Sequence, residues 1–396
     1  MKPAIITAFT ATSCLGTGVS AHREALLAER SGLAPCRFDT VDFDTFAGEA
    51  TAVDAQQLPA ELSHFDCRNN RLAWLALRQD GFADAVRDCR ERVGTSRIGV
   101  FLGTSTSGIL QTELAYRHRL PDGALPRSFH YAQTHNAFSV TDFTRRLLGL
   151  TGPAATISVA CASSAKVFAQ AARCLAVGLI DAAVVGGADS LCLTTMYGFH
   201  SLQLTSPRPC RPFDAARDGI SIGEAAAFAL VERDGPAAAS GRFALLGTGE
   251  SGDAHHMSAP HPDGEGALMA MRAALRDAGL SPAQVDYVNL HGTGTPGNDR
   301  AESKAVNALF TPETPCSSTK GATGHALGAA GALEAVISLI ALEQGLVPAG
   351  LNVTQVAPEL RLDYARHNLR RPLQRVLSNS FGFGGANCSL VFGKPG

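Results

Sequence analysis

The stretch SVACASSAKVF, Ser158 to Phe168, places one cysteine where a strand-like run gives way to a run of small residues. The segment Ala154–Ala160 before it is β-prone, and Ser164–Gly178 after it has apolar residues at helical spacing. A strand that passes directly into a helix is the basic unit of an α/β protein. Cys161 therefore stands at a strand-to-helix junction.

The rest of the chain repeats this alternation of strand and helix. We expect strands at Pro3–Phe9, Arg97–Gly103, Ala154–Ala160, Asp181–Gly187, Ala226–Glu232, Val285–His291, Val376–Ser380 and Ser389–Phe392. We expect helices at Ala21–Ala28, Arg71–Ala85, Ser164–Gly178, Glu265–Ala278, Arg300–Ala308 and Gly328–Glu343. This alternation predicts an α/β fold with mostly internal sheets. No low-complexity linker interrupts the chain, so any two halves would pack closely.

The segment that begins at Cys161 has a weak counterpart 167 residues later, at Gly328 (328 − 161). Each segment has a turn of tiny residues, an apolar helix, a glycine break and a strand. Chance similarity between alanine-rich helices explains the match as well as a duplicated α/β unit does. Duplicated halves would bring the N-termini of the two helices together near the centre of the molecule.

Composition and charge exclude several classes of function. Of the 396 residues, 45% are hydrophobic and 18% charged, which is typical of a globular protein with a large core. The net charge of −2 argues against a bulk nucleic-acid or membrane-surface binder. No apolar run approaches the roughly 18 to 20 residues that span a bilayer. The N-terminus predicts a first strand rather than a signal peptide.

The ten cysteines are scattered and include no Cys-x-x-Cys pair. This pattern predicts reduced thiols in a cytoplasmic protein, with neither a disulfide framework nor a zinc site. Cys161 itself has two interpretations. At the first turn of a helix, the dipole and the unpaired amides would lower the pKa of its thiol and could also stabilise an oxyanion. Alternatively, it is one more small apolar residue in a core.

Two of the twelve histidines lie beside glycine-rich turns. His291 ends the expected strand in VDYVNLHGTGT, at a strand's carboxyl end, where α/β proteins commonly form sites. His325 lies in SSTKGATGHALGAAG, at the entry to a helix of small residues. Either could supply the partner that a nucleophilic cysteine needs, or could be a core histidine bonded to the backbone.

Three further residues stand out. Lys320 lies in a segment of low charge and could be a buried cation, with Glu302 as its counter-ion, since an unpaired buried lysine is costly. Ordinary surface positions are the alternative for both. In SNSFGFGGANCSL, Phe383 lies among glycines that let the backbone approach a ligand, and it could gate a pocket or simply belong to a sharp turn.

Other sites lack their required patterns. GTGES at residue 247 lacks a full dinucleotide-binding motif, and no Walker sequence or paired-carboxylate signature is present. The histidines at 255, 256 and 261 are not at a zinc spacing.

Four ordered motifs together resemble the β-ketoacyl-[acyl-carrier-protein] synthase family, in its Cys-His-His form. They are VACASSA around Cys161, HGTGTPGND from His291, STKGATGHALGAAG around Lys320 and His325, and SNSFGFGGAN around Phe383. The resemblance spans essentially the whole chain. It implies an α/β, thiolase-like, five-layer α-β-α-β-α fold of two similar halves, which we place at residues 1–240 and 241–396.

The resemblance also implies a condensing acyltransferase. Cys161 would take an acyl chain as a thioester. His291 and His325 would then stabilise the enolate formed when malonyl-carrier protein loses CO2, and the enolate would attack the acyl carbonyl. The backbone N–H groups of Cys161 and Phe383 would form the oxyanion hole, and the Phe383 ring would gate the pocket.

Supporting roles follow from the same resemblance. Lys320, with Glu302, would orient His325 and set its charge. Thr293 and Thr295 match positions that bind the phosphopantetheine arm. The family needs no metal and no soluble cofactor, because the phosphopantetheine belongs to the carrier protein.

The expected partners are an acyl carrier protein and a second ketosynthase-like subunit, as a homodimer or as a heterodimer with a chain-length-factor subunit. Carrier proteins are acidic, so we expect a basic rim. Arg68 and Arg71 fall in a segment that resembles the carrier-docking helix, and Arg208 lies near a second docking loop; ordinary solvated arginines are the alternative. No nucleic acid or membrane partner is expected.

Two departures from the family pattern bear on substrate choice. RDGI ends in Ile220 where the family commonly has phenylalanine, and the loop LTSPRPCRPFD (204–214) looks shortened. Both predict a specialised polyene or polyketide branch rather than primary fatty-acid synthesis. The alternatives are a non-elongating, chain-length-factor-like subunit, which usually lacks the nucleophile, and a thiolase, for which Cys388 is poorly placed. A His-Asn condensing enzyme would have asparagine where His325 stands.

Overall fold

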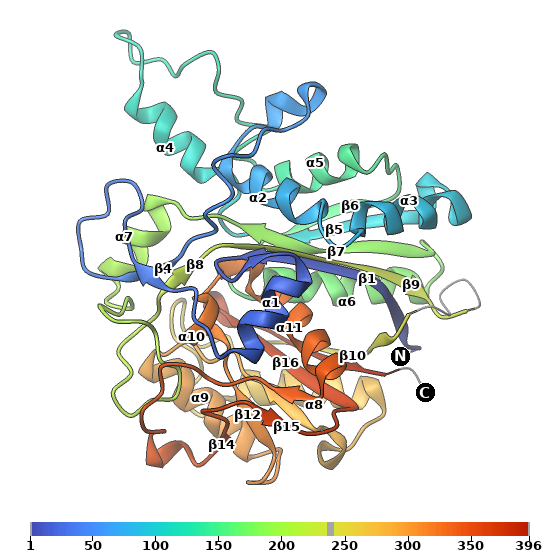
Figure 1. Cartoon of the computed structure of the whole chain (residues 1–396), viewed down its shortest axis with the longest axis vertical. Coiled ribbons are helices and arrows are strands. Elements are labelled where there is room, and N and C mark those ends of the chain that lie inside the picture. The colour runs from blue at the N-terminus through green and yellow to red at the C-terminus, as the bar shows by residue number, and fades with distance from the viewer. Residues whose placement is uncertain (1, 236–240, 395–396) are drawn as a thin grey trace.

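The computed structural model describes residues 2–235 and 241–394, and its frame is one long sheet made of two similar halves (Figure 1). The first half runs in the order β6 (Ala154–Ile157), β5 (Ile98–Gly103), β7 (Ala182–Asp189), β9 (Ala225–Arg233) and β1 (Ala4–Ser13). The second half runs in the order β12 (Pro315–Ser317), β11 (Tyr287–Asn289), β16 (Arg375–Gly382), β17 (Ala386–Gly393) and β10 (Phe243–Gly252), with β14 (Asp363–Tyr364) outside β12. Antiparallel pairing of β1 with β10 joins the two halves.

The two halves share their strand directions as well as their strand order. β5 is parallel to β6 and β7, and β11 is parallel to β12 and β16. The added edge strand β14 is parallel to β12, and the remaining neighbours within each half are antiparallel. The helix after β6 begins at residue 163 and the helix after β12 and its short turns begins at residue 330, 167 positions apart. The weak repeat in the sequence therefore marks a duplicated α/β unit.

Helices complete five layers. α6 (Ser163–Ala176) and α11 (Ala330–Gln344) lie between the two halves of the sheet, in a core cluster that draws on both. α2 (Arg68–Leu77), α3 (Phe82–Val93) and α5 (Ser139–Leu147) cover the outer face of the first half, and α8 (Glu265–Ala278) and α9 (Pro296–Asn307) cover that of the second. The predicted α-β-α-β-α fold is confirmed.

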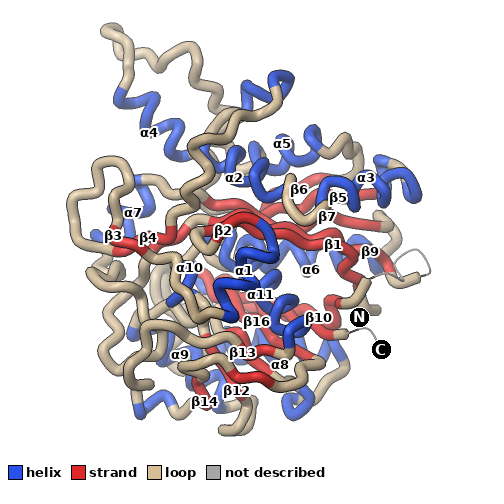
Figure 2. Tube along the Cα trace, in the orientation of Figure 1, coloured by secondary structure: helices blue, strands red, loops and turns tan. Residues whose placement is uncertain are grey.

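Smaller elements lie around this frame. They are the helices α1 (Gly18–Leu27), α4 (Ile109–Arg117), α7 (Leu193–Ser201) and α10 (Lys320–Thr323), and the strands β2 (Gly16–Thr17), β3 (Ala34–Pro35), β4 (Phe46–Gly48), β8 (Ile222–Gly223), β13 (Leu346–Val347) and β15 (Leu369–Arg370). Figure 2 shows a long loop after α4, residues 118–138, that projects from the body of the molecule. We call α4 with this loop the arm.

Three expected elements differ from the structure. The helix expected at Arg71–Ala85 is two helices, because Asp80 and Gly81 between them have φ of +56° and +68°, which end a helix. The strand expected to reach His291 ends at Asn289, so His291 lies in the turn beyond it. The third difference is strand β10, where no strand was expected. At its Gly249 an added Cβ would lie 2.0 Å from the carbonyl oxygen of Ala270, so α8 packs closely on this strand.

The expectation that no apolar run approaches the length of a membrane span is wrong, because the segment Leu327–Gln344 is long and apolar enough to cross a membrane. However, 89% of it is buried inside the protein, as in a core helix. The boundary that we predict between residues 240 and 241 adjoins the segment 236–240, which lies outside the described residues, so the division at that residue stays a prediction.

Candidate active site

A left-handed residue presents Cys161 at the start of α6. Ala160 has φ of +50°, a conformation that costs a residue with a Cβ roughly 1–2 kcal/mol. The Ser163 hydroxyl holds this bend: it accepts a hydrogen bond from the Val159 N–H at 2.9 Å and donates to the Ala160 carbonyl at 2.6 Å. The chain thereby turns sharply from strand to helix with the thiol of Cys161 beside the first turn of α6.

The same bend recurs 167 residues later. Leu327 also has φ of +50°, and Gly328 occupies the place that corresponds to Cys161. The Gly328 N–H donates to a carboxylate oxygen of Asp189 at 2.6 Å. The duplicated unit therefore carries a cysteine at this position in one half only.

The structure brings together the three residues predicted to do chemistry. The sulfur of Cys161 and one ring nitrogen each of His291 and His325 lie within 4.8 Å of one another, and all three residues are buried. The two imidazole rings stand edge to face, with centroids 5.3 Å apart. Cys161 comes from the first half and both histidines from the second, so the site exists only where the halves meet.

Hydrogen bonds to the rings define which nitrogen carries the proton. The Leu327 N–H donates to Nδ1 of His325 at 3.2 Å, so the proton of a neutral His325 lies on Nε2. The Lys320 Nζ lies 3.4 Å from Nδ1 of His291 and assigns the same tautomer there. Burial and the Lys320 charge hold the pKa of both imidazoles well below the usual 6.5. Both histidines are thus neutral N–H donors.

One cysteine and two histidines this close also have the composition of a metal site. A metal needs a free ring lone pair, but in each histidine the lone pair lies on Nδ1, where it faces a hydrogen-bond donor. The donor set therefore does not fit a metal ion.

Lys320 is a buried cation, as expected, but Glu302 is not its counter-ion, and that prediction is wrong. Its Nζ forms an ion pair with the buried carboxylate of Glu334 and also donates to the His291 carbonyl. Burial raises the pKa of Glu334 to about 7, and the Lys320 charge opposes that rise. Glu334 had one signal in the sequence: it is the only charged residue between Leu327 and Leu342.

Glu302 instead holds the turn that carries His291. Its carboxylate accepts the N–H groups of His291 and Gly292 at 2.8 and 2.7 Å, and burial raises its pKa to about 7. Asp299, one helical turn earlier in α9, accepts the next two N–H groups, those of Thr293 and Gly294, at 3.0 and 3.2 Å. Asp299 was not predicted, because nothing in the sequence distinguishes it from a solvated helix residue.

The resting thiol of Cys161 is not the acidic group that its helix position predicted. Burial raises its pKa to about 12, although the Lys320 charge and a hydrogen bond from the Phe383 backbone both lower it. The nearby carboxylates of Asp189 and Glu334 raise it further. The Cys161 thiol is therefore neutral in this structure, and its proton would have to leave before the sulfur could act as a thiolate.

A cavity of about 190 Å³ gives access to the three residues. Its walls include three of the other predicted site residues, Thr293, Thr295 and Phe383, together with Phe199, Leu204 and Ile220. The ring of Phe383 packs against Phe199, with centroids 5.6 Å apart. The hydroxyls of Thr293 and Thr295 are 2.8 Å apart. Ile220, the departure from the family pattern, thus faces the substrate space.

The three predicted docking arginines have different environments in the structure. Arg68 is only 8% exposed and pairs with Glu224, Asp54 and Glu49, so its prediction as a docking residue is wrong. The sequence could not show this, because Glu224 lies 156 positions away. Arg71 forms an ion pair with Asp66 in the same surface region. The Arg208 side chain is 60% exposed and forms an ion pair with Asp218 at 3.0 Å.

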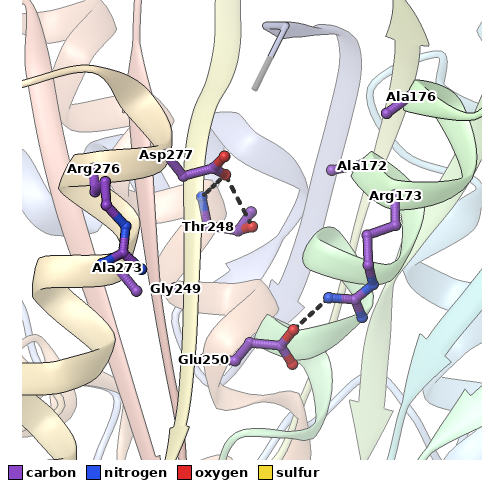
Figure 3. Close-up of a pocket in the computed structure, with 9 residues that line it drawn as sticks. All are labelled: Ala172, Arg173, Ala176, Thr248, Gly249, Glu250, Ala273, Arg276 and Asp277. Atoms are coloured by element: carbon purple, nitrogen blue, oxygen red, sulfur yellow. Dashed lines mark hydrogen bonds and ion pairs between the residues drawn. The ribbon is translucent and has the colours of Figure 1, made fainter.

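A larger surface groove, about 500 Å³, lies between α6, β10 and α8 (Figure 3). Arg173 and Glu250 form an ion pair across it, and Asp277 accepts the Thr248 N–H at 2.9 Å. It contains none of the residues at the duplicated bends, so the chemistry belongs to the smaller cavity.

Fold and site together define a condensing acyltransferase: a buried cysteine nucleophile and two N–H donors share one cavity at the junction of duplicated halves. Residues 1–237 match the family model for the β-ketoacyl synthase N-terminal domain, and residues 243–354 match that for the C-terminal domain. The chain belongs to the β-ketoacyl synthase family.

Known relatives agree over the full length. The 3-oxoacyl-[acyl-carrier-protein] synthase 2 of Vibrio cholerae is 34% identical over 98% of both chains, and that of Synechocystis is 33% identical over 99% of this chain and 98% of the relative. A ketosynthase from Xenorhabdus doucetiae, solved in complex with its chain length factor, is 38% identical, with a TM-score of 0.90 over 100% of this chain and 98% of that one. A β-ketoacyl synthase from Burkholderia phymatum is 30% identical, with a TM-score of 0.89 over 100% of both chains.

Proposed function

We propose that Cys161 carries the growing acyl chain. In the first step its sulfur attacks the thioester of an acyl-carrier protein, a new thioester forms, and the carrier's phosphopantetheine thiol leaves with the cysteine proton. In the second step malonyl-carrier protein enters the same cavity. Its carboxylate leaves as CO2, and the electron pair of the broken C–C bond becomes an enolate.

The enolate then attacks the acyl carbonyl on Cys161. A C–C bond forms, the C–S bond to Cys161 breaks, and the product leaves as a β-ketoacyl chain two carbons longer on the carrier. One observation supports this sequence most: two neutral imidazole N–H donors share the cavity with Cys161, where an enolate oxygen would develop charge.

The surrounding residues have supporting roles in this proposal. The backbone N–H groups of Cys161 and Phe383 donate hydrogen bonds to the oxyanion of the tetrahedral intermediate. Lys320 fixes the tautomer of His291, and Glu302 fixes the turn on which His291 lies. Thr293 and Thr295 contact the phosphopantetheine arm. No step requires a metal ion or a soluble cofactor.

We propose an acyl carrier protein and a second, related subunit as partners in the cytoplasm. The Xenorhabdus ketosynthase was solved with its chain length factor. Strand β6 lies at one edge of the sheet, and the arm exposes the large apolar side chains Tyr116, Leu120, Tyr131 and Phe138. A partner subunit, in a homodimer or a heterodimer, would cover the sheet edge and these side chains. Arg208 remains the exposed candidate for carrier docking.

We further propose that the chain elongates polyene or polyketide chains rather than primary fatty acids. Ile220 in place of an aromatic residue changes the cavity wall. A thiolase activity is less favoured, because Cys388 is fully buried within β17. A non-elongating subunit is less favoured, because nucleophile and both histidines are present and converge.

Two substitutions test the chemistry. Cys161→Ala should abolish condensation, and intact-mass measurement after incubation with a panel of acyl-carrier proteins should show an adduct on the native chain only. His325→Ala should retain that adduct but lose release of CO2 from malonyl-carrier protein. Condensation by Cys161→Ala, or unimpaired CO2 release by His325→Ala, would refute these roles. The acyl lengths that form adducts would also identify the pathway.

A further inference from the structure

Asp189, at the carboxyl end of β7, is the most heavily bonded carboxylate close to the active site. It is fully buried, and it accepts the N–H groups of Ser105 and Thr106 as well as the hydroxyls of residues 104, 105 and 106. These five donors all come from the loop after β5, in the first half of the molecule. The sixth donor is the Gly328 N–H, at 2.6 Å, from the second half.

That sixth bond reaches the chain just beyond His325. Leu327, between them, has φ of +50°, which a residue with a Cβ adopts only where its surroundings enforce it. The N–H of this strained residue donates to Nδ1 of His325 and so determines that the ring presents Nε2–H to the cavity. The peptide on one side of Leu327 is therefore held by Asp189, and the peptide on its other side sets the tautomer.

The space around Gly328 has no room for a side chain. An added Cβ there would lie 2.7 Å from the Ser105 nitrogen and 2.8 Å from Asp189 Oδ2. The Ser105 hydroxyl is a second acceptor for the Gly328 N–H, at 3.1 Å. Without the carboxylate, Leu327 could relax to an ordinary φ, and one of its flanking peptides would rotate.

We propose that Asp189 is a positioning residue for His325: it holds the Gly328 amide, which keeps Leu327 left-handed and its N–H on Nδ1 of the histidine. This inference rests on the proposed role of His325 in decarboxylation. Its consequence is selective. Asp189 serves the step that needs the imidazole donor, whereas transfer of the acyl chain to Cys161 depends on the first bend and not on the second.

The test is Asp189→Asn, which keeps the shape but turns one oxygen into an N–H donor that opposes the Gly328 N–H. Release of CO2 from malonyl-carrier protein should slow by roughly tenfold or more, as expected when a catalytic donor is misplaced. Acylation of Cys161 by an acyl-carrier protein, followed by intact mass, should not slow by more than about threefold, because loss of the Asp189 charge only lowers the pKa of the Cys161 thiol.

The matched control is Asp214→Asn, because Asp214 is also a buried carboxylate that accepts several backbone N–H groups but does not contact either bend. It should leave the ratio of CO2 release to acylation unchanged. A native chain that performs neither reaction would refute the proposed function. A native chain that performs both, with Asp189→Asn either fully active or equally slowed in both, would overturn only the role of Asp189.

If Asp189→Asn does not fold, a milder variant still tests the proposal. Ser105 is half-buried, and Ser105→Ala removes one donor to Asp189 and the second acceptor of the Gly328 N–H. CO2 release should slow by about threefold with acylation unchanged, since one of two acceptors is lost. Equal slowing of both reactions, or no change in either, would contradict the proposal.

Discussion

At the scale of single residues, burial decides the charge of each group in the active site. It keeps the two histidines neutral, because an imidazolium would be desolvated next to the Lys320 ammonium. The same burial raises the pKa of the carboxyls of Glu302 and Glu334 to about 7. The groups that titrate near neutral pH are therefore acids that support the histidines, and not the histidines themselves.

This assignment predicts how condensation depends on pH. Protonation of Glu302 replaces an acceptor of backbone N–H groups by a donor, and protonation of Glu334 leaves Lys320 without its counter-charge. Both changes occur as the pH falls, so kcat/KM should fall on the acid side with an apparent pKa near 7. Because two protons bind, the logarithm of kcat/KM should reach a slope of about two.

Glu302→Gln separates the two groups. The variant should be less active at every pH, and its acid limb should have a slope of about one, because only Glu334 still titrates. Glu265→Gln is the matched control, since this glutamate is exposed at the start of α8 and should leave the profile unchanged. A native limb that follows one proton near the ordinary histidine pKa would contradict the assignment.

At the scale of elements, two helices of small residues bring the bends together. α6 and α11 cross at Gly331, where an added Cβ would lie 2.7 Å from the nitrogen and 2.8 Å from the Cβ of Ala165. Larger residues here would push apart the two helices that follow Cys161 and His325. The alanine and glycine content of these segments is thus a packing requirement as well as a helix preference.

Gly331→Val should therefore destabilise the protein. Overpacking a dense core costs typically 1–3 kcal/mol, and we expect about 3 kcal/mol, measured as the free energy of unfolding in urea. Gly198→Ala is the control: this glycine lies in α7, an added Cβ would meet nothing within 4 Å, and alanine should stabilise the helix by up to about 1 kcal/mol. Equal stabilities of native chain and Gly331→Val would contradict close packing at the crossing.

At the scale of the whole molecule, the halves share one core. β1 pairs with β10, and the cluster around α6 and α11 contains residues from both halves of the sheet. Each half also has a cluster of its own under its outer helices, but the central cluster is common to both, so neither half should unfold alone. The active site likewise contains residues from both halves, with Cys161 from one and the two histidines from the other.

Cooperative unfolding is the corresponding prediction. The single tryptophan, Trp74, lies in α2 on the outer face of the first half, so its fluorescence reports on that half alone. Thermal unfolding followed by Trp74 should coincide with far-ultraviolet circular dichroism, which reports on both halves. Gly331→Val, in the second half, should lower both midpoints equally. A Trp74 transition unmoved by that substitution would show that the halves unfold independently.

The site was predictable as far as local motifs reach. Cys161, His291, His325 and Phe383 each lie in a glycine- or alanine-rich turn whose shape follows from adjacent residues, and their motifs occur in a recognisable order. The ion-pair partners of the site residues were less predictable. Glu302 was assigned to Lys320 because an unpaired buried lysine is costly, and Glu334 meets the same need.

By itself, the sequence determined the alternation of strand and helix, the repeat at 167 residues and the identity of the reacting groups, because these depend on neighbours a few positions apart. Only the tertiary structure decided that Glu334 neutralises Lys320, that Arg68 is buried against Glu224, and that the Cys161 thiol has a raised rather than a lowered pKa. These outcomes depend on burial and on contacts between distant segments. Sequence spacing does not specify which of many charged side chains the packing of two halves will bring together in a region without water.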